Sequence, residues 1–509
     1  MFSEVSISKI QSLNYNTDLC KDRVRLYIVP AMPNNFLFDT AGEQYEQKRL
    51  AHWDQIARKR DSWQGWSGPY HRRLQEMYSY LISPGQRVLE VGCGTGSLLA
   101  AVRPSRGVGI DFSAEMIGRA RKRHPELEFI EADAHDLSAV DGPFDTIILS
   151  DLVNDVWDVQ RVLQEVRRLC IPSTRLIINV YSGLWQLPLA VAQWVNLASA
   201  TLPQNWLTPD DARGMLNLAG FDVIRIWPEV LWPLPWSGFA NKFLVRFWPF
   251  NELALCNFII ARPQAQPPAS EPSVSIIVPA RNESGNIRAI FERMPKLGSE
   301  TELVFVEGHS RDDTYAAIER EIAAHPTTPA RLFRQSGIGK ADAVRLGFQE
   351  ARGDILMILD ADLTVPPEDL PRFYQALRDG KGEFINGVRL VYPMEKEAMR
   401  GLNFLGNKLF SMAFSLILGQ PVKDTLCGTK VLWRKEYELI AANRAYFGDF
   451  DPFGDYDLIF GAAKLNRRIV DLPTRYRERT YGTTNISRWK HGWLLVRMVW
   501  FAAWRIKFI

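Results

Sequence analysis

The sequence predicts an α/β protein of two domains, each built around a mostly parallel sheet. Three observations lead to this prediction. The chain has 509 residues, more than one ordinary domain holds. Short apolar segments alternate with helical patterns twice along it. A stretch rich in Pro and Ala, residues 262–272, separates the two series and has no periodicity of its own.

Each series contains five short apolar segments that we expect to form strands. In the first they lie at 87–91, 107–110, 128–131, 146–150 and 175–180; in the second they lie at 274–278, 302–306, 331–334, 355–359 and 383–387. We therefore expect an N-terminal extension at 1–64, a first domain at 65–261, a linker at 262–272, a second domain at 273–488 and a C-terminal helix at 489–509.

Composition, net charge and cysteine content limit the classes of protein to which this chain can belong. The composition is 46% hydrophobic and 23% charged, as in a globular protein, and the net charge of +3 favours no nucleic-acid partner. Five scattered cysteines suit a reducing compartment. The first ten residues lack the basic segment and apolar core of a signal peptide, so we expect a cytoplasmic protein.

The first series carries a glycine turn, V-L-E-V-G-C-G-T-G, at residues 88–96. Glycines at positions 92, 94 and 96 allow a tight strand-to-helix turn and close approach of a ligand. Asp111 ends the next strand, about 20 residues on, where an acid would hold ribose hydroxyls. Asp133 and Asp151 follow the third and fourth strands, so all these positions share the ligand edge of the sheet.

This series resembles the class I S-adenosylmethionine-dependent methyltransferases over roughly residues 65–261, which implies a Rossmann-like sheet and S-adenosylmethionine as cofactor. By that resemblance, Glu90 and the loop of Gly92, Gly94 and Gly96 border the methionine part of the cofactor. Methyl transfer depends mainly on alignment of the two reactants, and the sequence does not specify the acceptor. The resemblance assigns the ribose to Asp111 and the adenine to Asp133 and Ala134, with Asp151 at the same edge.

The second series carries I-L-D-A-D-L after a buried strand. Asp360 and Asp362 are two residues apart, so on an extended chain both side chains point the same way. Two such carboxylates, together with substrate phosphates, typically hold magnesium or manganese. Upstream lie S-I-I-V-P-A-R-N-E, V-E-G-H-S-R-D-D-T and G-I-G-K-A-D.

Together these segments resemble the family 2 glycosyltransferases of the GT-A fold over residues 273 to about 490, and most of all the branch that glycosylates polyprenyl phosphates. The resemblance implies a nucleotide-diphosphate sugar as donor, with Asp360 and Asp362 holding Mg²⁺ or Mn²⁺. Glu307 stands where the family usually has Asp. The implied donor-binding residues are Pro279, Ala280, Asn282, Glu283, Glu307, Lys340, Asp342 and Asp360.

The resemblance also implies catalytic and acceptor residues. Asp424 matches an acid near the donor sugar, and Asp455 is the first candidate for the general base, with Asp457 second. A phosphate acceptor is already ionised and would need little base catalysis. Arg477 and Arg479 match a basic loop that clamps the acceptor phosphate.

Three segments favour contact with a membrane surface. Residues 402–418 form an apolar helical pattern with a narrow polar stripe. Residues 479–509 carry six Lys or Arg, four Trp and no acid. Trp227, Trp232, Trp236 and Trp248 lie among prolines. We therefore expect a peripheral enzyme on the cytoplasmic face of a membrane.

The predicted function is a fused methyltransferase and glycosyltransferase, which transfers sugar to a polyprenyl-phosphate or glycolipid acceptor. Two alternatives remain at this point. The glycosyltransferase could use a saccharide hydroxyl, with Asp455 as base. The first domain could instead be a binding or scaffolding module without catalysis.

Overall fold

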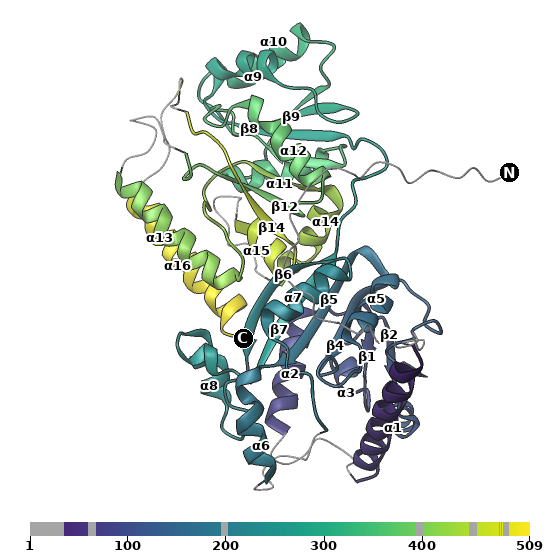
Figure 1. Ribbon diagram of the computed structural model, residues 1–509. Helices are drawn as coiled ribbons and strands as arrows, with labels where there is room; N and C mark the ends of the chain where they lie inside the picture. Colours follow the sequence, from purple (N-terminus) through teal and green to yellow (C-terminus); the bar gives the residue numbers. More distant parts are fainter. Residues whose placement is uncertain are drawn as a thin grey trace, which may run out of the picture. The chain divides into compact units, whose positions relative to one another are not determined.

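The computed structural model describes residues 35–59, 68–194, 202–392, 401–446, 456–477, 479, 481 and 488–509. The chain divides into two units, Met1–Gln47 and Lys48–Ile509. In the first unit, the described residues are the start of helix α1 (Asn35–Lys59). Both sheets belong to the second unit (Figure 1).

The first sheet has seven strands in the order β3-β2-β1-β4-β5-β7-β6. β7 runs antiparallel to both of its neighbours, and the other strands are parallel to one another. Five strands were predicted, and β6 and β7 are additional. The strands are β1 (Arg87–Val91), β2 (Arg106–Asp111), β3 (Glu128–Glu131), β4 (Phe144–Ser150), β5 (Cys170–Tyr181), β6 (Phe221–Glu229) and β7 (Cys256–Pro263).

Helices pack on both faces of this sheet because successive strand residues point to opposite sides. In β1, Leu89 and Val91 belong to one buried cluster and Val88 to another. The helices are α2 (Gly68–Leu81), α3 (Ser97–Ala101), α4 (Ala114–Arg123), α5 (Val159–Arg168), α6 (Gln186–Trp194), α7 (Pro209–Leu218) and α8 (Gly238–Lys242).

The second sheet also has seven strands, in the order β10-β9-β8-β11-β13-β12-β14. Only β13 runs against its neighbours. The strands are β8 (Val274–Ala280), β9 (Thr301–Glu307), β10 (Ala330–Arg334), β11 (Ile355–Ile358), β12 (Phe384–Val388), β13 (Lys430–Trp433) and β14 (Ile469–Pro473).

Two long helices of the second domain, α13 and α16, lie side by side (Figure 1). α16 covers the start of the helix expected at 489–509, and Ala503–Lys507 continue it as a π-helical turn. The helices of this domain are α9 (Ile287–Arg293), α10 (Thr314–Ala324), α11 (Lys340–Glu350), α12 (Leu370–Arg378), α13 (Gly401–Leu418), α14 (Arg434–Ala442), α15 (Tyr456–Lys464) and α16 (Arg488–Ala502).

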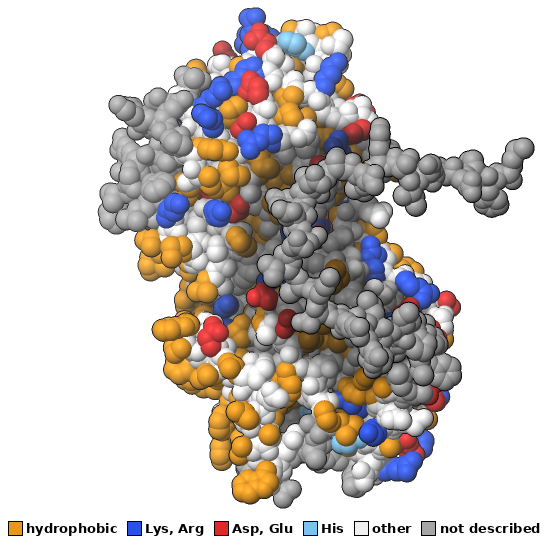
Figure 2. Space-filling model, in the orientation of Figure 1, with side chains coloured by type: hydrophobic (Ala, Val, Ile, Leu, Met, Phe, Trp, Pro, Cys, Tyr) orange, Lys and Arg blue, Asp and Glu red, His pale blue; other side chains and the backbone are white. Residues whose placement is uncertain are grey.

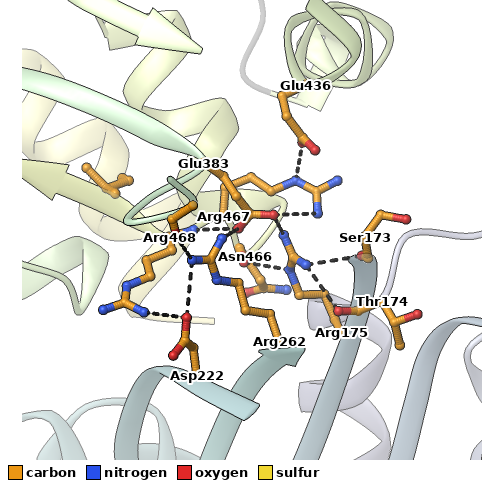
Figure 3. Close-up of polar contacts among 12 residues, drawn as sticks. Ser173, Thr174, Arg175, Asp222, Arg262, Glu383, Glu436, Asn466, Arg467 and Arg468 are labelled. Carbon is orange, nitrogen blue, oxygen red and sulfur yellow. Dashed lines mark hydrogen bonds and ion pairs between the residues drawn. The ribbon is translucent and has the colours of Figure 1, made fainter. Parts of the chain in front are cut away.

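A buried cluster of charged residues joins the two sheets (Figure 3). Glu383, just before β12, contacts Arg175 of β5 at 2.5 Å and Arg262 of β7 at 3.7 Å. Arg175 also donates to the Asn466 carbonyl (2.9 Å). Burial alone would raise the pKa of Glu383, but the surrounding guanidinium groups lower it to about 2. The two domains therefore share a fully charged, desolvated contact.

Candidate functional site

The glycine turn lies at the point where the strand order of the first sheet reverses. From β1 the chain continues to β2 on one side, and later places β4 on the other side of β1. The crevice outside the carboxyl ends of two such strands is the usual ligand site of an open α/β sheet. The predicted cofactor residues lie at this edge, as the parallel strands require.

The three glycines of the turn have positive φ angles of 76° at Gly92, 52° at Gly94 and 74° at Gly96. A Cβ atom would lie 2.9 Å from Leu152 at Gly92 and 2.6 Å from Phe129 at Gly96, whereas at Gly94 it would meet nothing within 4 Å. The outer two glycines are therefore needed for packing, while the space above Gly94 is open to a ligand.

Glu90 and Asp111 are buried acids beside the turn. Asp111 accepts hydrogen bonds from the backbone N–H groups of Gly94 (2.8 Å) and Ser113 (3.0 Å). Burial outweighs these bonds and raises the pKa of Asp111 to about 6. Burial also raises the pKa of Glu90, whose Oε2 atom has no hydrogen-bond partner among the described residues. A buried acceptor with a free oxygen at this edge fits a ligand with donor groups.

Asp133 lies at the same edge, after β3. Its Oδ1 atom accepts from the His135 N–H (2.7 Å) and lies 2.6 Å from His135 Nδ1. Burial acts to raise the pKa of Asp133, but the contacts with His135 outweigh it, and the pKa is lowered. Ala134 packs against the buried cluster on one face of the sheet. The predicted adenine contact stays a prediction.

Asp151 follows β4 and has a positive φ of 54°. Its Oδ1 atom accepts from the Tyr70 hydroxyl (2.7 Å) and the Asn179 amide (2.5 Å). Burial raises its pKa to about 6, although these bonds and one from Tyr181 oppose the shift. Sequence reasoning did not assign Tyr70 or Asn179 to the site, because no spacing links α2 and β5 to Asp151.

The end of helix α1 covers part of this edge, which sequence reasoning also missed. The Ser113 hydroxyl donates to Asp54 Oδ1 (2.5 Å). Trp53 Nε1 donates to Asp155 Oδ2 (2.7 Å), and Arg49 Nε donates to Asp155 Oδ1 (2.9 Å). A segment for which the sequence suggested no chemistry thus helps to enclose the predicted cofactor site.

The strand order of the second sheet reverses in the same way, between β8 and β11. Pro279 and Ala280 end β8, Glu307 ends β9, and Asp360 and Asp362 follow β11. All five lie at the carboxyl edge of parallel strands. The structure therefore brings the predicted donor residues of these strands to one edge.

Two segments beyond β8 and β9 are tied together. Asn282, with a φ of 58°, accepts from the Arg311 N–H (2.8 Å). Glu307 accepts from the Ser310 N–H (2.5 Å) and from Arg334 Nε (3.3 Å). Burial acts to raise the pKa of Glu307, but these contacts lower it. The longer side chain at this position still reaches the loop that follows β9.

Asp360 is paired with Lys340, at 2.7 Å. Burial acts to raise the pKa of Asp360, but Lys340 outweighs it and lowers the pKa. A Cβ atom on Gly428 would lie 1.9 Å from Asp360 Oδ2, so only glycine permits this position. Asp342 accepts from the Gly337 N–H (3.0 Å) and so shapes the loop that ends at Lys340.

Asp362 is held by a different cation. Arg479 donates to Asp362 Oδ2 (2.5 Å) and to Glu283 Oε1 (3.1 Å), which links Asp362 to the segment that follows β8. The Thr364 hydroxyl donates to Asp362 Oδ1 (2.8 Å). Burial raises the pKa of Glu283 to about 7, against the opposing effect of Arg479. Sequence reasoning predicted Arg479 as a phosphate clamp and did not predict these contacts.

The predicted catalytic acids lie in different environments. Asp424 is fully buried, and Arg389 donates to both of its oxygens (2.8 and 2.9 Å). Asp457 is paired with Arg444 (2.8 Å) and Arg345 (3.2 Å). Asp455, the first candidate base, lies outside the described residues.

Arg477, the other predicted phosphate clamp, is exposed. Its backbone N–H donates to the Thr364 carbonyl (2.9 Å), two residues from Asp362. The Arg477 backbone is therefore held close to Asp362, one of the two predicted metal ligands, while its side chain is exposed.

Comparison with known proteins gives matches in both halves of the chain. Residues 275–438 match the model for "Glycosyl transferase family 2", and residues 88–173 match the model for "Methyltransferase domain".

Individual relatives match over shorter parts. The dolichol-phosphate mannosyltransferase of Pyrococcus furiosus is 34% identical over 21% of this chain and 30% of its own length. The low-salt glycan biosynthesis hexosyltransferase Agl6 of Haloferax volcanii is 27% identical over 45% of this chain and 53% of its own length. The chain thus spans less than a third of the first of these relatives and about half of the second.

Among solved structures, an S-adenosylmethionine-dependent methyltransferase from Mesorhizobium loti is 18% identical over 39% of this chain and 100% of its own, with a TM-score of 0.31. The family matches agree with the predicted order of the two domains and with the α/β fold of each sheet. The chain carries, in that order, a methyltransferase domain and a family 2 glycosyl transferase domain, as predicted.

Proposed function

We propose that the second domain transfers a sugar from a nucleotide diphosphate to a polyprenyl phosphate at a membrane surface, and that the first methylates an acceptor with S-adenosylmethionine. One observation supports the proposed glycosyl transfer. Asp360 and Asp362 lie at the sheet edge where the strand order reverses, and each is paired there with a cation, Lys340 or Arg479. Two carboxylates and two cations at one edge suit a metal-bound diphosphate.

The donor set fits a hard divalent cation. Carboxylate oxygens are the ligands that Mg²⁺ and Mn²⁺ prefer, and both aspartates are held in place by neighbouring groups. A bound cation would stabilise the charge that develops on the leaving diphosphate. Lys340 and Arg479 neutralise the two carboxylates in this structure and are placed to contact phosphate oxygens instead.

The reaction is a displacement at the sugar carbon. An oxygen of the acceptor phosphate forms the new bond to that carbon, and the bond to the diphosphate breaks, with its electron pair leaving on the nucleoside diphosphate. An ionised phosphate needs no proton removed. Asp457, the second candidate base, is paired with two guanidinium groups, which fits a reaction that needs no base at this position.

Helices α13 and α16 support the membrane site. On α13, the exposed side chains include Leu409, Met412 and Leu416, three and four residues apart. On α16, Trp493, Val496 and Trp500 form a similar stripe. Among the described residues, no helix is long and apolar enough to cross a membrane. We propose that these helices lie on the cytoplasmic face, where both small-molecule donors are available.

The methyltransferase edge fits S-adenosylmethionine. The free Oε2 atom of buried Glu90 can accept from the amino group of the ligand, and the open space above Gly94 lets the backbone approach it. Asp111 keeps both oxygens oriented by backbone N–H groups, as a ribose acceptor requires. When bound, the cofactor supplies an electrophilic methyl group, and the protein aligns the acceptor with it.

The proposal is tested with the full chain, a panel of radiolabelled nucleotide sugars and polyprenyl phosphate in vesicles. We expect label in the lipid phase with Mg²⁺ or Mn²⁺, and none with excess chelator. Transfer only to soluble saccharides would assign a hydroxyl acceptor instead, and full transfer in chelator would remove the metal from the mechanism. Calorimetry with S-adenosylmethionine tests the first domain separately.

A further inference from the structure

Two segments of the methyltransferase domain leave the sheet at its ligand edge. Residues 183–194 follow Tyr181, the last residue of β5, and residues 232–253 connect β6 to β7. Cys256, which begins β7, pairs with both Tyr181 and Glu229, the last residue of β6. Because β5 and β6 run parallel to β1, both segments start from the edge that carries the glycine turn.

Both segments expose large apolar side chains. Trp236 is 99% exposed, Trp194 83% and Trp248 80%. Figure 2 shows hydrophobic side chains gathered along the side of the molecule that carries α13, α16, α8 and α6 in Figure 1. An apolar patch of this kind on a folded protein marks an interaction surface. Leu184, Leu187, Val191, Phe239, Phe247 and Leu253 are exposed on the same segments.

The segments are held in a defined conformation. The buried side chain of Asn241 accepts from the Trp232 N–H (2.7 Å) and donates to the Trp232 carbonyl (2.8 Å), which closes the loop that presents Trp236. Trp185 Nε1 donates to the Leu253 carbonyl (2.8 Å) and joins the two segments. The exposed tryptophans therefore lie on segments whose conformation is fixed by hydrogen bonds.

The apolar side chains continue onto the glycosyltransferase domain. The ring of Phe243 lies 5.4 Å from that of Phe508 and 5.8 Å from that of Trp504, and Trp504 contacts Trp500 at 6.1 Å. These rings connect residues 232–253 with the exposed stripe of α16. One surface thus includes elements of both domains.

We propose that residues 183–194 and 232–253 bind the same lipid surface as α13 and α16, and that the methyl acceptor is the head of a lipid-borne molecule in that surface. This inference rests on the proposed membrane site of the glycosyltransferase. Both segments leave the sheet at the edge that carries Tyr181 and Asp151, so an acceptor held in the surface that they bind lies next to that edge.

Charge identifies the occupant as an anionic bilayer rather than a second copy of the chain. Tryptophan prefers the membrane–water interface. Residues 401–418 and 479–509 contain no acid, and Lys408 and Arg497 are exposed beside their apolar stripes. A cavity of about 530 Å³ next to the loop of Trp236 is lined by residues that include the cations Arg72 and Lys242 and the acid Glu76. Cations beside exposed aromatic rings suit phosphate headgroups.

The step itself is a methyl transfer to an oxygen or nitrogen of the lipid head. The lone pair of that atom forms the new bond to the methyl carbon, and the electron pair of the broken sulfur–carbon bond stays on sulfur. The proton of the acceptor passes to the carboxylate of Asp151 or to water. No further reactant is needed.

Hydrogen exchange of the full chain, with and without vesicles of phosphatidylcholine and phosphatidylglycerol in equal parts, tests the surface. We expect vesicles to protect residues 183–194, 232–253, α13 and α16. Protection of α13 and α16 alone would overturn this inference and leave the proposed function standing. Protection of none of them would overturn both. Protection that depends on protein concentration and not on vesicles would assign the surface to a second copy and overturn the inference.

The acceptor is tested with methyl-labelled S-adenosylmethionine and vesicles made from a total lipid extract of the producing cells. We expect label in the organic phase, and a loss of about tenfold in vesicle binding and lipid methylation for Trp236→Ser combined with Trp248→Ser. Leu218→Ser is the matched control, because Leu218 is 79% exposed at the end of α7, near the start of β6 at the opposite sheet edge. Label confined to the water-soluble phase, or equal losses in the control, would overturn the inference. Unchanged cofactor binding of the double variant by calorimetry verifies its fold.

Discussion

The two ligand edges of this protein share one topology and have opposite electrostatics. At the methyltransferase edge, burial raises the pKa of Glu90, Asp111 and Asp151, and the described residues place no lysine or arginine against them. At the glycosyltransferase edge, Lys340 lowers the pKa of Asp360 despite burial, and hydrogen bonds from Ser310, together with Arg334, lower the pKa of Glu307. Glu283, with its pKa raised to about 7, is the exception at this second edge.

The difference follows from the ligands that we propose. A cationic sulfonium with donor hydroxyls suits the desolvated carboxylates of Glu90, Asp111 and Asp151, although Asp155 at the same edge is paired with Arg49. A diphosphate carries several negative charges, so its edge needs cations from the protein and a metal. Two sheets with the same switch-point geometry can thus select opposite charges through the residues that follow their strands.

The largest effect is expected at the second edge. Asp360→Asn removes one charge from the proposed metal site and one partner of Lys340. Glycosyl transfer should fall by about 10³-fold, because preorganised charge on the leaving group is a large catalytic contribution. S-adenosylmethionine binding should be unchanged. Initial rates with a labelled donor measure the first effect and calorimetry the second.

The control for this variant is Glu319→Gln, on the exposed face of α10. It removes the same charge from the same domain and should leave the rate within about twofold. A full rate for Asp360→Asn would show that the second edge does not depend on this carboxylate.

The next effect concerns the charged contact between the domains. Glu383→Gln leaves Arg175 and Arg262 without this partner in a buried site. Removal of one member of a buried ion pair typically costs about 3–5 kcal/mol of the free energy of unfolding. Because its folded pKa of about 2 is below the ordinary value, the stabilisation by Glu383 is present at neutral pH and is lost only as the pH falls towards 2. Urea unfolding at pH 7 measures the loss.

An exposed ion pair gives the matched control for Glu383. Arg106 and Glu128 lie 3.4 Å apart, with exposed fractions of 39% and 51%. Glu128→Gln should cost less than about 1 kcal/mol. Equal losses for Glu383→Gln and Glu128→Gln would mean that the contact between the domains is effectively solvated.

A smaller effect is expected from Asp111→Ala at the first edge. The substitution removes the acceptor that backbone N–H groups orient beside the glycine turn. The affinity for S-adenosylmethionine should fall by about 1–3 kcal/mol through lost ribose hydrogen bonds. Calorimetry measures it, with Asp210→Ala, an exposed acid of the same domain, as control. An unchanged affinity would remove Asp111 from the cofactor site.

Parts of both edges were predictable because parallel strands place their carboxyl ends together. That rule placed Asp111, Asp151 and Asp360 correctly at the edges of their sheets. β6 and β7 were not predicted: β6 contains Pro228, and β7 ends at Pro263, the second residue of the expected linker.

Contacts between distant side chains were beyond any sequence pattern. Arg479 reaches Asp362 across 117 positions, and Tyr70 reaches Asp151 across 81. Asp424 was predicted near the donor sugar, and the structure adds a bidentate bond to Arg389 that no spacing indicates. Such partners are set by how helices and loops pack over the sheet, which periodicity does not describe.

The smallest effect, and the most direct comparison of the two edges, is the pH dependence of ligand binding. The pKa of Asp111 is about 6, and an acceptor of ribose hydroxyls must be ionised. Between pH 7 and pH 5 the affinity for S-adenosylmethionine should therefore fall by about tenfold. Asp360 has a lowered pKa and stays ionised, so Mn²⁺ binding at the second edge should change little over the same range, and Glu283, with a pKa of about 7, is the group of this edge that titrates there. Because the folded pKa of Asp111 exceeds its unfolded value, the apo protein should lose no stability from this group as the pH falls, which separates weaker binding from unfolding. Calorimetric titrations with each ligand at both pH values measure the difference, and Asp111→Ala should reduce the pH dependence at the first edge, where Asp151, with a pKa of about 6, also titrates, and leave the second edge unchanged. Equal pH profiles at the two edges would show that their carboxylates do not differ in charge state as the structure indicates.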